Sequence, residues 1–153
     1  MNTVSTRLAG LLLWQLLVAG SGMSAGPLAA QAAPQPPPAI PLTPNAQGYV
    51  RVETKSGPIR CSINAELVAC QTAAGNWPRR PDGQPFHVAS INGNGELRWV
   101  DADLGALEGR VTLDYQTYSA QGWTIVAGPD STTFTNDRTG HGMSVSNQTV
   151  ESF

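Results

Sequence analysis

The sequence predicts an all-β domain over residues 48–153, a small antiparallel sandwich or barrel with one hairpin disulfide. Short runs rich in Val, Ile, Thr and aromatic residues follow one another here, separated by Gly, Pro, Asn and Asp. No window shows the apolar spacing of an amphipathic helix. Two cysteines, Cys61 and Cys70, are spaced to face each other across one β-hairpin.

The predicted strands have the length and composition of half-buried β-strands, and turn-forming residues lie between them. They are residues 49–54, 59–63, 67–72, 86–91, 96–100, 111–115, 122–126, 132–135 and 142–145. The clearest turns are 92–95 (Asn-Gly-Asn-Gly), 128–130 and 136–140. Residues 101–109 fit either a short helical turn or an irregular loop.

The cysteine spacing predicts the register of one hairpin. If Ala65-Glu66 is its two-residue tip, Cys61 faces Cys70 in a non-hydrogen-bonded pair, where the Cα atoms lie about 4.5 Å apart and a disulfide fits. A structural disulfide is favoured, because redox pairs prefer C-x-x-C and a zinc site needs about four ligands. Ala-Glu lacks the positive-φ residues of a type I′ turn, so a longer tip remains an alternative.

The N-terminus has the layout of a secretory signal peptide, which we place at residues 1–32. Arg7 precedes an apolar run from Leu8 to Val18, and Ala30-Gln31-Ala32 matches the cleavage pattern. Cleavage at Ser24-Ala25-Gly26 and an uncleaved anchor remain alternatives. The run is about 11 residues long, short of the ~20 of a transmembrane helix. We therefore expect a secreted or envelope-associated protein with no membrane span after cleavage.

Residues 33–47 form a Pro-rich linker before the β domain. Such a composition favours extended polyproline II and cannot build a packed core. The segment is interpreted as a spacer, with a ligand for a proline-recognition domain as the alternative.

Composition argues against nucleic-acid binding. The 153 residues carry a net charge of -2, with 9 Lys+Arg against 11 Asp+Glu, and only 13% of them are charged. A nucleic-acid-binding domain normally shows a basic excess or a basic stripe. The expected partner is therefore an unknown envelope or extracellular molecule and not a nucleic acid.

Two groups of motifs resemble a known family. They are Ser56-Gly57-Pro58-Ile59-Arg60-Cys61 with Val68-Ala69-Cys70, and Leu113-Asp114-Tyr115, Gly122-Trp123, Phe134-Thr135-Asn136 and Thr139-Gly140-His141-Gly142-Met143. In this order they resemble small exported actinobacterial domains of unknown function, of the mycobacterial type. The resemblance covers most of residues 49–153. It implies secretion and an all-β fold, and it implies no activity.

The sequence departs from that family pattern at four positions. Pro58 replaces an Asn, which removes a backbone donor and indicates an edge or a bulge. Gln116 stands where relatives often carry Gly. Phe134 and Ile125 occupy positions where relatives carry cysteines, so an apolar contact between the two would replace a second disulfide.

Candidate binding residues are His141, Trp77 and Tyr118. Glycines on both sides of His141 would let a ligand approach it, although a plain turn explains the pattern as well. Trp77, in the loop sequence Trp-Pro-Arg-Arg-Pro, is the best candidate for a surface contact, whereas Trp99 and Trp123 are expected to fill the core. Tyr118 belongs to the same set of aromatics, which could stack on sugars.

No cofactor, metal site or catalytic centre is predicted. Asp101-Ala102-Asp103-Leu104-Gly105 with Glu108 resembles part of a cation loop but lacks the EF-hand spacing. The mature domain has no G-x-S-x-G elbow, phosphate loop or HExxH motif. We expect a non-enzymatic binding module. A carbohydrate- or cell-wall-binding module that uses exposed aromatics, and a hydrolase centred on His141 with an acid such as Asp114, are the alternatives.

Overall fold

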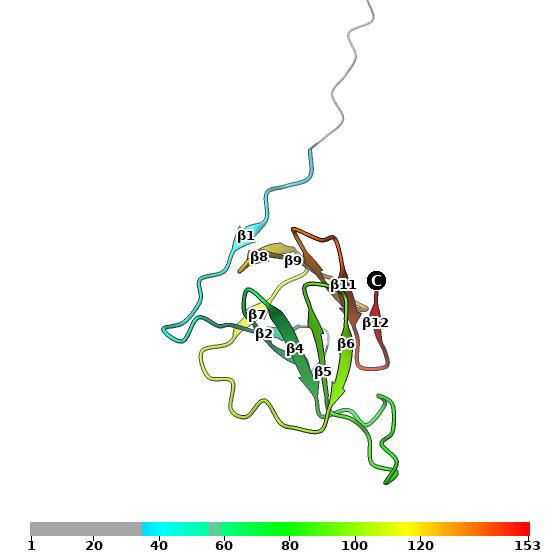
Figure 1. Ribbon diagram of the computed structural model, residues 1–153. Coiled ribbons are helices and arrows are strands. Elements are labelled where there is room, and N and C mark those ends of the chain that lie inside the picture. Colours follow the sequence, from blue (N-terminus) through cyan, green and yellow to red (C-terminus); the bar gives the residue numbers. More distant parts are fainter. Residues whose placement is uncertain (1–34, 56, 58) are drawn as a thin grey trace, which may run out of the picture. The chain divides into compact units, whose positions relative to one another are not determined.

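The computed structural model describes residues 35–55, 57 and 59–153, and all regular structure in that part of the chain is β-strand (Figure 1). The predicted signal peptide, the start of the predicted linker and Pro58 lie outside the described residues. The twelve strands form two six-stranded sheets that make a sandwich, which confirms the all-β prediction and chooses the sandwich over the barrel.

The first sheet is an antiparallel meander of five consecutive strands with a sixth strand at one edge. In spatial order it contains β6 (Leu97–Val100), β5 (Val88–Asn92), β4 (Leu67–Thr72), β3 (Ile59–Ile63), β2 (Val50–Thr54) and β7 (Val111–Leu113). The edge strand β7 runs parallel to β2.

The second sheet repeats this plan. In spatial order it contains β1 (Ile40–Pro41), β8 (Thr117–Ala120), β9 (Trp123–Ala127), β10 (Thr132–Asn136), β11 (Gly142–Val145) and β12 (Val150–Ser152). Its edge strand β1 runs parallel to β8. Each meander is therefore joined at its first strand by a short parallel strand that precedes the other meander in the chain.

The predicted strands are confirmed with shifts of one or two residues at their ends, but three strands were not predicted. β8 reads Thr-Tyr-Ser-Ala, which is too polar and small to stand out from a loop. β1 has two residues, one of them Pro41, and lies within the predicted linker. The linker prediction is therefore corrected: Ile40 pairs with Tyr118, and Leu42 packs against the core. β12 is short and mostly exposed.

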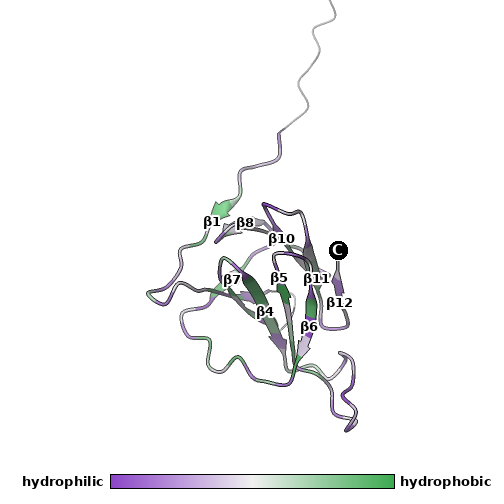
Figure 2. Ribbon diagram, in the orientation of Figure 1, coloured by the Kyte–Doolittle hydropathy of each residue, from purple (hydrophilic) through white to green (hydrophobic). Residues whose placement is uncertain are grey.

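Alternation of side chains explains why the sheets stack. β2, β3 and β10 alternate between fully buried and half-buried residues, as expected of strands with one face on a core. Figure 2 shows β4 and β5 largely apolar, with the loop between them largely polar. The largest fully buried side chains come from both sheets and from one loop; they include Trp77, Ile63, Ile91, Leu113, Trp123, Ile125, Phe134 and Met143.

The predicted disulfide lies inside the sandwich. Cys61 and Cys70 are bonded and directly opposed, with Cα atoms 4.1 Å apart, and neither is exposed to solvent. The two-residue tip is confirmed, yet neither tip residue has a positive φ. Instead, the Asn64 side-chain oxygen accepts hydrogen bonds from the backbone N–H groups of Glu66 and Leu67 at 2.9 and 2.8 Å. An Asx turn therefore closes the hairpin.

Phe134 and Ile125 are cross-strand partners on β10 and β9, and both are fully buried. The predicted apolar contact between them is thus confirmed. It contributes by burial, whereas a covalent link would act on the unfolded chain.

Residues 101–110, which we name the strap, form an irregular segment that crosses the outer face of the first sheet from β6 to β7. The backbone N–H of Leu104 donates to Gln71 Oε1 on β4 at 2.7 Å. Arg110 Nε donates to Glu53 Oε2 on β2 at 2.9 Å. Leu107 is buried beneath the strap and lies outside the main core cluster. The strap thus covers part of a face that would otherwise meet water.

The Cys61→Ala/Cys70→Ala variant tests the contribution of the disulfide. Closing a loop this short stabilises the fold by about 2.5–3 kcal/mol in the chain-entropy model. We expect the free energy of unfolding in urea to fall by that amount while the far-UV circular dichroism stays unchanged. A reducing agent should lower the midpoint of the natural protein and leave that of the variant where it is. Equal midpoints for the two oxidised proteins would contradict this role.

The Leu107→Ala variant tests how the strap is held. Removing a buried leucine side chain should cost about 2 kcal/mol, the lower end of the usual range, because an irregular segment can settle into the space. Amide hydrogen exchange should become faster in the strap and stay unchanged in β9 and β10. Uniform acceleration across both sheets would show that Leu107 belongs to the main core.

Candidate functional site

His141 lies on the surface in the turn between β10 and β11. Its ring Nδ1 is 3.1 Å from the backbone oxygen of Phe153, and its backbone N–H donates to Thr139 Oγ1 at 3.3 Å. Within the described residues no hydrogen bond or ion pair joins the imidazole to the side chain of an Asp or a Glu. These are the contacts of a turn residue, and they connect the β10–β11 turn to Phe153.

Asp114, the suggested acid partner of His141, is engaged elsewhere. Its carboxylate accepts a hydrogen bond from Lys55 Nζ at 2.7 Å, and both side chains are exposed. The bond and the charge of Asp114 raise the pKa of Lys55. The ammonium also lies 5.6 Å from the centre of the Tyr115 ring. His141 and Asp114 therefore have other partners, and the structure does not pair them as the acid and base of a hydrolase site.

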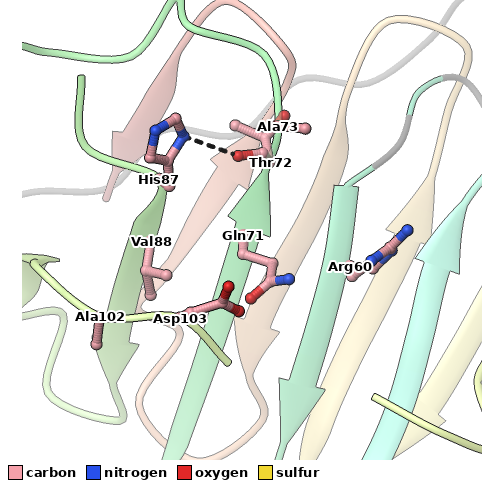
Figure 3. A pocket seen from close by; sticks show the side chains of 8 residues that line it. All are labelled: Arg60, Gln71, Thr72, Ala73, His87, Val88, Ala102 and Asp103. Carbon is pink, nitrogen blue, oxygen red and sulfur yellow. Dashed lines mark hydrogen bonds between the residues drawn. The ribbon is translucent and has the colours of Figure 1, made fainter. Parts of the chain in front are cut away.

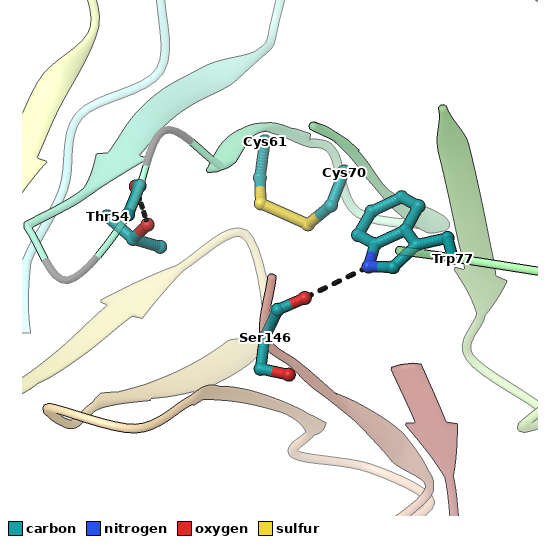
Figure 4. Close-up of a disulfide and its surroundings, with 6 residues drawn as sticks. Thr54, Cys61, Cys70, Trp77 and Ser146 are labelled. Atoms are coloured by element: carbon teal, nitrogen blue, oxygen red, sulfur yellow. Dashed lines mark hydrogen bonds between the residues drawn. A yellow bond between two sulfur atoms is a disulfide. The ribbon is translucent and has the colours of Figure 1, made fainter. Parts of the chain in front are cut away.

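Trp77 is buried, with 2% of its surface exposed, which corrects the expectation of a surface contact. Its indole Nε1 donates to the backbone oxygen of Ser146 at 3.0 Å (Figure 4). Its ring packs edge-on against Trp99, with centroids 5.5 Å apart. Because the sequence Pro-Arg-Arg-Pro follows Trp77, its sequence context resembles a surface loop. The loop folds back and inserts this one side chain into the core.

Tyr118 is also buried, so its ring is not available to stack on a ligand. Its hydroxyl accepts a hydrogen bond from the backbone N–H of Asp114 at 2.9 Å. The bond fixes the connection by which the chain passes from β7 in one sheet to β8 in the other. Trp123 is fully buried as expected, and Trp99 is half-buried.

Two of the three acidic residues of the strap have structural partners. Asp101 forms an ion pair with Arg80, and Asp103 Oδ1 accepts a hydrogen bond from the backbone N–H of Gly105 at 2.8 Å. In the part of the chain that the structure describes, no three His, Cys, Asp or Glu side chains are grouped so that they could hold a metal ion.

Four hairpin turns meet at one end of the sandwich and enclose a polar pocket of about 570 Å³, which we name the turn pocket. The β3–β4 and β5–β6 turns form one side, and the β8–β9 and β10–β11 turns form the other. Its lining residues are Ala65, Glu66, Asn92, Gly93, Asn94, Gln121, Gly122, Asn136, Asp137 and Arg138.

Hydrogen bonds hold the turns of the two sheets together around the turn pocket. Thr139 Oγ1 donates to the backbone oxygen of Gly93 at 2.5 Å, and Trp123 Nε1 donates to the backbone oxygen of Asn64 at 3.0 Å. The Gly93 N–H donates in turn to the backbone oxygen of Glu66 at 3.2 Å. Gly93 lies close to Asn136, since a Cβ there would be 3.1 Å from Asn136 Nδ2. Hydrogen bonds within the fold thus hold the rim of the pocket in place.

Several side chains of the turn pocket are not used by the fold. The side chains of Glu66, Asn94 and Arg138 make no hydrogen bond with any other described residue, whereas Asn92 uses both its oxygen and its nitrogen within its own turn. Asp137 holds Thr124 Oγ1 with one carboxylate oxygen at 2.6 Å. A carboxylate, an amide and a guanidinium therefore remain available for a ligand with both donors and acceptors.

A second pocket, of about 340 Å³, lies on the outer face of the first sheet beside the strap (Figure 3). We name it the strap pocket. It contains Arg60, His87 and Asp103, whereas no Phe, Tyr or Trp of the described chain lines either pocket. Sequence reasoning proposed neither pocket, because each assembles residues from turns and strands far apart in the chain.

The Trp77→Phe variant separates a structural from a binding role for this residue. Loss of the indole hydrogen bond and of part of the ring should lower the free energy of unfolding by about 1–3 kcal/mol. The exposed Tyr115→Phe variant should leave stability unchanged in the same urea titration. A Trp77→Phe protein that is as stable as the natural one would contradict the structural role.

Comparison of the chain with family models, with curated proteins and with solved structures found no match in any of the three.

Proposed function

We propose that this chain is a non-enzymatic binding domain that acts outside the cytoplasm and holds its ligand in the turn pocket. The observation that carries the proposal concerns the four turns, which come from both sheets and are connected by hydrogen bonds. They surround side chains that make no hydrogen bond with other described residues. Pockets that bind small ligands are usually largely formed beforehand and contain a few well-placed polar groups. The turn pocket has both properties, and it differs from most such pockets in its largely polar lining.

The disulfide supports the proposed compartment. Disulfides persist in oxidising compartments and are rare in the cytosol, so the buried Cys61–Cys70 bond is compatible with an exported protein. Among residues 35–153, leaving aside 56 and 58, there is no helix with the length and apolarity needed to cross a bilayer. The sequence resemblance to small exported domains points in the same direction.

The chemistry of the turn pocket favours a polar ligand. Glu66 and Asp137 bring negative charge, Arg138 brings positive charge, and Asn94 brings an amide. Such a mixture suits a ligand rich in hydroxyl groups or a polar peptide segment, since both offer donors and acceptors. An unknown envelope or extracellular molecule of this kind is the proposed partner.

A cell-wall carbohydrate is the ligand class to test first, because paired carboxylate, amide and guanidinium groups can bond to sugar hydroxyls. This alternative no longer depends on Trp77 and Tyr118, which are buried. The exposed aromatics Tyr49, Tyr115 and Phe153 lie outside both pockets. Recognition would therefore depend on hydrogen bonds more than on stacking.

The Glu66→Gln/Arg138→Gln variant tests the turn pocket. Neither side chain makes a hydrogen bond in the described fold, so the variant should keep its melting temperature. We expect its retention on immobilised bacterial cell-wall polysaccharide to fall at least about tenfold, the effect of losing charged hydrogen bonds to a ligand. The Glu151→Gln/Arg98→Gln variant makes the same charge changes outside the pocket and should bind like the natural protein.

Two outcomes separate the ligand classes. If the natural protein is not retained on the polysaccharide at physiological salt, the carbohydrate alternative is excluded. A photo-crosslinking residue placed at Asn94 should then join a polypeptide in secreted material, and the same residue placed at Glu151 should not. Failure of both arms would contradict the turn pocket as a binding site.

A further inference from the structure

The strap pocket has features that the turn-pocket proposal does not use. Its floor is the outer face of the first sheet, formed by Arg60 on β3, Gln71 on β4 and Val88 on β5. These three residues are aligned across neighbouring strands. Ala102 and Asp103 of the strap form one wall, and His87 lies at the end away from Arg60 (Figure 3).

Arg60 is the unusual group in this pocket. Its cross-strand neighbour Glu53 is bonded to Arg110 Nε at 2.9 Å, and no ion pair joins Glu53 to Arg60. The Arg60 guanidinium makes no hydrogen bond within the described chain, and its Nε is buried without a partner. A buried donor without an acceptor is costly. The Nε atoms of Arg51 and Arg80 are also buried without a partner, but both of those arginines use their terminal nitrogens within the fold, and no such bond is present for Arg60 among the described residues. Among the described residues Arg60 therefore has no acceptor, and a ligand could supply one.

One further polar group in the pocket, the side-chain amide of Gln71, can donate to the same ligand, whereas His87 offers an acceptor at the far end. Gln71 Oε1 accepts the Leu104 N–H, and the Gln71 side-chain nitrogen has no partner among the described residues. His87 Nδ1 lies 3.1 Å from the backbone oxygen of Thr72, which can only accept, so Nδ1 carries a proton. The other ring nitrogen, Nε2, makes no hydrogen bond in the described chain.

The rest of the lining limits the ligand to a small singly charged acid. Ala73 and Ala102 provide apolar surface, Val88 lies buried beneath it, and a volume of about 340 Å³ is at the small end for ligand pockets. Asp103 brings negative charge to the wall and would repel a doubly charged anion such as phosphate about twice as strongly as a singly charged one. A carboxylate is planar and can take two parallel hydrogen bonds from Nε and one Nη of an arginine.

We propose that the strap pocket binds a small organic monocarboxylate, with its carboxylate on Arg60 and its apolar body against Ala73 and Ala102. The carboxylate supplies the acceptor that the buried Nε lacks, and Gln71 contributes a further donor. This site is separate from the turn pocket and stands independently of the function proposed for it.

The test is a titration of the ¹⁵N-labelled natural protein, followed by NMR, with benzoate as the probe. Benzoate should produce saturable shifts of the Arg60 Nε–H signal and of the backbone amides of Gln71, Ala102 and Asp103. Benzamide has nearly the same shape without the charge and should produce none at equal concentration. Inorganic phosphate should bind more weakly than benzoate.

Variants test whether the benzoate carboxylate contacts Nε and one Nη of Arg60. Arg60→Gln should weaken benzoate binding at least about tenfold, and Arg60→Lys should weaken it less, because it keeps the charge without the paired donors. The exposed Arg98→Gln variant on the same face should bind benzoate normally. If Arg60→Gln fails to fold, the Nε–H signal of the natural protein still decides the matter. Equal shifts with benzamide, tighter phosphate binding or no saturable shift would overturn the proposal.

Discussion

The pairing of Cys61 with Cys70 is the constraint on which the rest of the structure depends. It fixes the register of the β3–β4 hairpin, and a slip of one residue would turn every side chain of that hairpin to the wrong face. In the observed register Arg60 and Gln71 face outward into the strap pocket, and Glu66 reaches the turn pocket. One covalent bond in the core therefore positions groups in both candidate sites.

Sequence reasoning succeeded where structure is local. The hairpin register followed from a spacing and a two-residue tip, and the Phe134–Ile125 contact, between strands that are neighbours in the chain, followed from the family resemblance. It failed where the burial of a residue depends on partners far away in the sequence. Trp77 is buried because its loop returns to Ser146, 69 residues away. Neither pocket could be foreseen, since no local pattern shows which turns share an end of a sandwich or where a strap will cross.

The two pockets divide the surface of the domain between different kinds of chemistry. The turn pocket is polar and is braced by hydrogen bonds between the sheets, such as the one from Thr139 to Gly93. The strap pocket combines one arginine with apolar side chains under a segment held mainly by Leu107 and a few polar contacts. Hydrogen bonds between the sheets hold the turns of the first pocket, whereas the strap beside the second is held by fewer contacts, which lowers the free energy of local opening there.

The short strand β1 also determines how the second sheet ends. The Leu42 N–H donates to the backbone oxygen of Ser119 at 2.8 Å, so the backbone of Pro41, one residue earlier, faces away from β8. Proline has no N–H to offer on that open side. A strand from a neighbouring molecule would find a missing donor there, which protects this rim from end-to-end growth into aggregates.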